Sequence, residues 1–151
     1  LYVEVLEKLY GDIRNTENRL HLAELPPVEA IRRLVEFTFD HHDRNVDFVR
    51  IVSIENIHNA EYVKRSDAIK AMNNTILDSL GEILRRGAEE GVFRAGLDAL
   101  DVHLLISSFC FYRVSNRHTF GEIFQIDLPD ESIKQRHREM ICESVLRYLQ
   151  A

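Results

Sequence analysis

Residues 98–124 read DALDVHLLISSFCFYRVSNRHTFGEIF, and this stretch decides the fold class. Its apolar side chains cover every azimuth of a helix, whereas a helix on a protein surface shows a single apolar stripe. Polar residues interrupt the run at Asp101, His103, Ser107 and Ser108, so the stretch is too short and too polar to span a bilayer. We therefore expect a helix that packs on its own core on one side and on a second subunit on another.

The rest of the chain has the periodicity of amphipathic helices and no sustained alternation of the kind that strands show. Four helices are predicted at about residues 1–23, 27–43, 46–58 and 66–90. A fifth opens at Asp98 and precedes a loop at 125–129, and a sixth ends near Leu149. The sequence thus predicts an all-α fold, a single helical-bundle domain of about six helices over residues 1–151.

The beginning of the chain suggests that a segment precedes it. Leu1 already belongs to an apolar helical pattern, and no Met and no Ser, Thr, Asp or Asn cap comes before it. We expect the chain to be the carboxy-terminal part of a longer protein, cut near a helix boundary.

Composition and charge narrow the class of protein. With 45% hydrophobic and 29% charged residues, the chain has the composition of an ordinary globular domain, and we expect a cytoplasmic protein without a membrane segment. A net charge of −6 argues against this segment binding a nucleic-acid backbone by itself. Cys110 and Cys142 lie in apolar helical contexts, which is typical of buried, reduced thiols.

One carboxylate stands out in the third predicted helix. Phe48, Ile51 and Val52 define an apolar face, and Glu55 and then Asn59 continue it. A carboxylate on a buried face is costly unless it is paired or hydrogen-bonded. Two interpretations stay open: a polar anchor inside a ligand pocket, or a structural salt bridge or helix-end carboxylate that reaches water.

The fifth helix offers possible partners for Glu55. Phe109, Tyr112 and Asn116 share a face, and Arg113 lies beside them as the first candidate to pair with Glu55. An aromatic wall with a few polar groups is typical of a small-molecule pocket, and equally of a packed interface. We expect a pocket between the third, fourth and fifth helices for an apolar or mixed small molecule. The candidate binding residues are Glu55, Asn59, Met72, Phe109, Tyr112, Arg113 and Asn116.

Catalytic and metal signatures are missing. Residues 55–58 match the Glu-x-x-His half-motif of di-iron bundles, but those sites need a second copy and two further Glu residues. His41, His42 and Asp43 are adjacent, so they point in different directions, and a solvated helix end is the simpler interpretation. We therefore expect no catalytic residue, no metal and no cofactor. A helical-bundle metal-binding protein or enzyme is the alternative function.

Four segments together resemble the carboxy-terminal domain of TetR-family transcriptional regulators. They are LYVEVLEKLYGDIR (1–14), FVRIVSIENIH (48–58), ILRRGAEEGVFR (83–94) and DVHLLISSFCFYRVSNRHTF (101–120). The resemblance implies an effector-sensing and dimerisation domain, with a homodimer built from the last two long helices and a pocket among the middle helices. It also implies a repressor whose amino-terminal helix-turn-helix, absent from these 151 residues, binds operator DNA. The effector itself is not implied.

Overall fold

The computed structural model describes residues 1–151 and confirms the all-α fold in one domain. Seven α-helices and two short 3₁₀ helices follow one another as α1 (Tyr2–Asn18), η1 (Leu22–Glu24), α2 (Pro27–Arg44), α3 (Val46–Ile57), η2 (Val63–Arg65), α4 (Asp67–Glu89), α5 (Ala99–Ser115), α6 (Arg117–Phe124) and α7 (Glu131–Leu149). There are no strands, only an isolated bridge between Phe93 and Gln150. None of the helices combines the length and the apolar character that crossing a bilayer requires.

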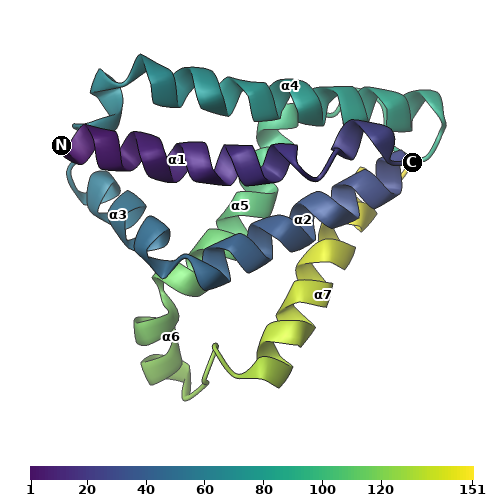
Figure 1. The fold of residues 1–151 in the computed structure, drawn as a ribbon. Helices are drawn as coiled ribbons and strands as arrows, with labels where there is room; N and C mark the ends of the chain where they lie inside the picture. Colours follow the sequence, from purple (N-terminus) through teal and green to yellow (C-terminus); the bar gives the residue numbers. More distant parts are fainter.

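The helices are arranged around two buried clusters. α1 and α4 run side by side, α2 and α5 cross beneath them, and α7 packs on α2 and α5 (Figure 1). The main core joins η1, α2, α4, α5 and α7, with Phe39, Leu80 and Ile106 among its fully buried side chains. A smaller cluster of Phe48 and Val114 with Val49 holds α3 on α5. The space between the two clusters is where a cavity opens.

Three helices begin at capping residues that fix their registers. The side chain of Ser66 accepts a hydrogen bond from the Ile69 amide at 3.1 Å, and Asp98 accepts one from Asp101 at 3.1 Å. Asp130 opens α7 in the same way. Each side-chain oxygen satisfies an amide that has no partner within its helix. These caps set where α4, α5 and α7 start, so the faces that they bury follow from the sequence.

Two predicted helix boundaries are wrong. The first helix ends at Asn18, not near residue 23, because the chain turns at His21 with a left-handed φ of 51° before η1. The fifth helix breaks at Asn116, where φ is −106° and ψ is 10°, so α6 is a separate helix. The Ser115 and Thr119 hydroxyls donate to the carbonyls of Tyr112 and Asn116 at 3.4 and 3.2 Å, and such local bonds from side chains to the backbone compete with a continuous helix.

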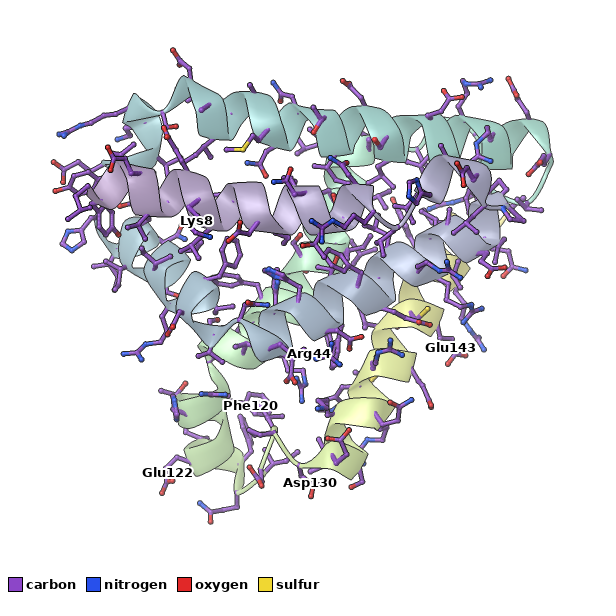
Figure 2. The ribbon with its side chains drawn as sticks, viewed as in Figure 1. Lys8, Arg44, Phe120, Glu122, Asp130 and Glu143 are labelled. Atoms are coloured by element: carbon purple, nitrogen blue, oxygen red, sulfur yellow. The ribbon has the colours of Figure 1, made fainter.

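The short helix α6 projects from the end of α5, away from the body of the bundle (Figure 1). Its Phe120 contacts Tyr112 edge-on and lies against Phe124 with the rings tilted and their centroids 4.7 Å apart. Figure 2 shows Phe120 and Glu122 on opposite sides of this helix. Ile123 and Phe124 are largely exposed, so α6 leaves apolar surface uncovered.

Candidate functional site

A cavity of about 400 Å³ lies among α1, α2, α3, α4 and α5. Its apolar wall combines Leu34 of α2, Phe48 of α3 and Ile106 of α5, which come from both buried clusters. A volume of this size is typical of sites for small organic molecules. The cavity thus lies among the middle helices and also reaches α1.

Aromatic rings and an imidazole line one side of this cavity. Tyr10 of α1 meets Phe48 edge-on at 5.3 Å between ring centroids. The ring centroid of His42 on α2 lies 5.7 Å from that of Phe48 and 6.1 Å from that of Phe111 on α5. These rings give the cavity a wall against which an apolar or aromatic group can pack.

A buried polar cluster faces these rings from α1 and α4. Arg14 Nη1 donates to both carboxylate oxygens of Glu17 at 3.0 Å, and Arg14 Nε donates to Asn73 Oδ1 at 3.0 Å. Arg14 and Glu17 are both buried. Burial is the main cause that raises the pKa of Glu17, and the Arg14 charge opposes it. The cluster joins α1 to α4 and gives the cavity charged and amide groups.

Two histidines add neutral polar groups. Burial, then the neighbouring His41, Arg14 and His103, lower the pKa of His42 to about 3, so its ring is uncharged at neutral pH. Its Nδ1 lies 3.2 Å from Nδ1 of His41. His103 has a pKa lowered by burial and Arg14, and its Nε2 lies 3.4 Å from the Ser107 hydroxyl. A neutral imidazole both donates and accepts hydrogen bonds, so these rings can orient a ligand without repelling either charge.

The structure confirms that Glu55 is buried but not that it pairs with Arg113. Glu55 Oε2 accepts hydrogen bonds from the amides of Tyr62 and Val63 at 3.1 Å, and so caps η2. Its Oε1 and the Tyr2 hydroxyl are buried without a hydrogen-bond partner. Burial and then the Glu55 carboxylate raise the pKa of Tyr2. The predicted Glu55–Arg113 pair is therefore wrong, because backbone amides take the place of the guanidinium.

Arg113 is buried at another point of the fold. Its Nη1 donates to Asp43 at 3.2 Å, its Nη2 donates to the Leu128 carbonyl, and its guanidinium stacks on Phe39. Its Nε lies 3.4 Å from the ring of His137. Arg113 thus fastens the loop before α7 to the end of α2.

The other predicted site residues are dispersed. Met72 contacts the α1 side near Gly11, Phe109 packs against His137, and Tyr112 is exposed beside α6. Asn59 is exposed in the turn after α3, and Asn116 ends α5. None of the seven predicted residues lines the 400 Å³ cavity. Their contact with an effector stays a prediction, whereas the cavity brings together a different set.

Sequence reasoning missed the polar residues that do line the cavity. His42 was assigned to a solvated helix end, but it is buried, because Phe48 and Phe111 cover it. Arg14 and Glu17 were not selected, although their spacing of three and their position beside Ile13 on an apolar stripe were visible. That spacing was the signal that could have identified them.

A second concave site is less well suited to a ligand. A groove of about 730 Å³ lies between α2 and α7, but its charged walls are largely paired, with Arg138 bound to Glu36 and Arg147 bound to Glu143. No group of three or more His, Cys, Asp or Glu side chains is arranged to hold a metal ion. The cavity among the first five helices is therefore the candidate functional site.

Comparisons with known proteins agree with this architecture. The family described as "Tetracyclin repressor-like, C-terminal domain" matches residues 27–145, which is most of the chain. The HTH-type transcriptional repressor NicS of Pseudomonas putida is 32% identical over 149 residues. That match covers 99% of this chain and 70% of the length of NicS.

Proposed function

Because the chain belongs to the TetR family of transcriptional regulators, as a tetracyclin repressor-like C-terminal domain, we propose that it senses a small-molecule effector and dimerises within a repressor. The observation that carries the proposal is the cavity, whose walls include Tyr10, Arg14 and Glu17 of α1. A ligand in this cavity contacts the first helix directly. If the ligand makes better contacts with one position of α1 than with another, its binding shifts α1 toward that position.

The partner within the regulator is a second copy of the chain. Leu100, Leu104, Ser108 and Tyr112 follow one another every fourth residue on the exposed side of α5. Met140 and Tyr148 are partly exposed on α7. Two such helices from each subunit form a four-helix bundle about a two-fold axis.

The DNA-binding function belongs to the intact protein. NicS is named an HTH-type transcriptional repressor, and the chain matches 70% of its length. We assign operator binding to a helix-turn-helix outside the 151 residues, because these residues carry a net charge of −6, which opposes contact with a phosphate backbone. The effector acts on the spacing of the two DNA-binding heads through α1.

The test uses the intact regulator on DNA adjacent to its own gene. Compounds that release the DNA in a fluorescence anisotropy screen should also raise the melting temperature of the 151-residue chain. Ser107→Trp should fill the cavity and abolish both responses while leaving DNA binding intact. Thr75→Trp, at an exposed position of α4, is the matched control and should respond like wild type. A Ser107→Trp protein that keeps the full response would contradict the assignment of the cavity.

A further inference from the structure

Arg14 has an unused side of its guanidinium. Its Nε donates a hydrogen bond to Asn73 and its Nη1 donates to Glu17, whereas no group in the chain accepts a hydrogen bond from Nη2. Arg14 is only 9% exposed, yet Nη2 is not among the fully buried polar atoms that lack a partner. Arg14 lines the cavity, and Nη2 is the part of its guanidinium that has no partner in the chain. Two strong N–H donors are therefore available to a ligand.

Arg14 is the source of positive potential inside the cavity. The charged lining residues of the cavity are Arg14, Glu17 and Lys70, and of these Lys70 is exposed and lies 3.9 Å from Asp67, so that the buried charges are those of Arg14 and Glu17. The Arg14 charge contributes to lowering the pKa of His42 and of His103, which come from two other helices. The field of Arg14 thus reaches across the cavity although Glu17 is bound to it. Next to the free Nη2 of Arg14, in such a partly dry space, an anion is attracted more strongly than it would be in water.

We propose that the effector is a small molecule with one negative charge on an apolar body, and that Arg14 Nη2 binds its anionic group. The proposal rests on the proposed function, because it concerns the same cavity. Phe48 and Phe111 contact the apolar body, and Lys70 lies at the rim on α4. A hydrogen bond between a guanidinium and an anion is about twice as strong as one between neutral groups.

The position of Arg14 gives this anion a regulatory role. Arg14 belongs to α1 and its partner Asn73 to α4, so the anionic group binds where these two helices meet. The new anion competes with Glu17 for the same guanidinium. Ligand charge therefore acts on the contact between α1 and α4, and a neutral molecule in the same cavity lacks this effect.

The test compares two fluorescent probes that share one ring system. The first is 8-anilinonaphthalene-1-sulfonate, which carries one negative charge, and the second is N-phenyl-1-naphthylamine, which is neutral. Arg14→Gln should weaken sulfonate binding by about tenfold or more and leave binding of the neutral probe within about twofold. Glu17→Gln should tighten sulfonate binding, because it removes the competing carboxylate. Arg85→Gln, at an exposed arginine of α4, should change neither affinity.

Several outcomes would overturn the inference. If Arg14→Gln loses affinity for both probes by the same factor, charge does not select the ligand. The same conclusion follows if Glu17→Gln binds the sulfonate more weakly than wild type. If Arg14→Gln does not fold, the tighter sulfonate binding expected for Glu17→Gln still tests the inference. Ser107→Trp separates this inference from the proposed function. If that variant keeps full binding of the neutral probe, the cavity is not the binding site at all.

Discussion

At the residue scale, Arg113 connects parts of the chain that are distant in sequence. It binds Asp43 at the end of α2 and the carbonyl of Leu128 before α7, and it packs on Phe39. Its side chain is 5% exposed and that of Asp43 is 22% exposed, so water replaces these contacts poorly. A buried cation with one charged partner and one carbonyl partner is costly to remove.

Replacing Arg113 should therefore destabilise the protein strongly. Arg113→Met leaves Asp43 with Lys134 alone and the Leu128 carbonyl without its donor. We expect the free energy of unfolding to fall by about 3–5 kcal/mol, as when one partner of a buried pair is deleted. Urea denaturation followed by circular dichroism measures this. Arg85→Met breaks only exposed ion pairs and should leave the urea midpoint unchanged; equal midpoints for both variants would show that Arg113 is not structural.

His42 should make stability depend on pH. The folded state lowers its pKa from the ordinary 6.5 to about 3, so between these values the unfolded chain binds one proton more than the folded chain. Stability then decreases as the pH falls from 6.5 toward 3, by up to about 1.4 kcal/mol per pH unit for this one group. His42→Gln should flatten the slope measured by urea denaturation between these two values. His58→Gln, at an exposed position, should keep it; an unchanged slope in His42→Gln would contradict the buried neutral ring.

Single residues were the level at which the sequence was least informative. The burial of Glu55 was predictable, because it continues an apolar face of α3. Its partners were not, because they are main-chain amides of a 3₁₀ turn, and an amide leaves no signature in the residue type. The cavity residues were missed for a related reason. Arg14, His42 and His103 come from three helices, and their convergence depends on crossing angles that periodicity does not contain.

At the scale of the element, the helices and their caps were predictable and the breaks were not. Ser66, Asp98 and Asp130 cap helices because short polar side chains before an apolar pattern fit the first-turn amides. The break at Asn116 lies in the polar run SNRHT (115–119), and such a run is as typical of an exposed helical turn as of a helix end, so the sequence did not locate the break. A tertiary contact also favours this boundary, because Arg113 binds the carbonyl of Leu128 fifteen residues later and so holds the returning chain against α5.

The glycines of α4 provide a matched pair on one helix. A Cβ on Gly87 would lie 2.6 Å from Cγ and Cε2 of the buried Phe93 and closer still to Cδ2, whereas a Cβ on Gly81 meets nothing nearer than Ala99 at 3.9 Å. Gly87→Ala should therefore lower the free energy of unfolding by about 1–3 kcal/mol through overpacking. Gly81→Ala should raise it by about 0.5–1 kcal/mol through helix propensity. Thermal unfolding of both variants checks this.

The same close approach predicts a rescue. Phe93→Leu combined with Gly87→Ala should cost less than the sum of the two single changes, because the smaller side chain yields the space that the methyl group needs. Strictly additive costs would mean that Gly87 is required for another reason.

At the scale of the whole molecule, the exposed side chains of α5 and α7 predict self-association. At micromolar concentration, light scattering should give a molar mass that is twice the 17.6 kDa of the chain. Leu104→Glu places a charge in the centre of the apolar α5 face, where Leu104 is 65% exposed, and should yield monomers. Ile57→Glu at the end of α3 changes an apolar residue that is 74% exposed and lies outside that face, so this variant should remain dimeric. A wild-type chain that is monomeric at this concentration would refute the proposed assembly.

The two contacts of Arg113 have a further consequence for how this chain tolerates changes in length. The chain leaves the bundle at Asn116 and is fastened again at Leu128, so residues 117–127 form an excursion with both ends anchored. Lengthening such a loop adds only a small closure entropy, about 0.6 kcal/mol for each doubling. A foreign epitope or a peptide tag placed after Gln125 therefore extends outward and leaves the register of α5 and α7 unaltered. The end of α6 is therefore the position at which this domain accepts an insertion.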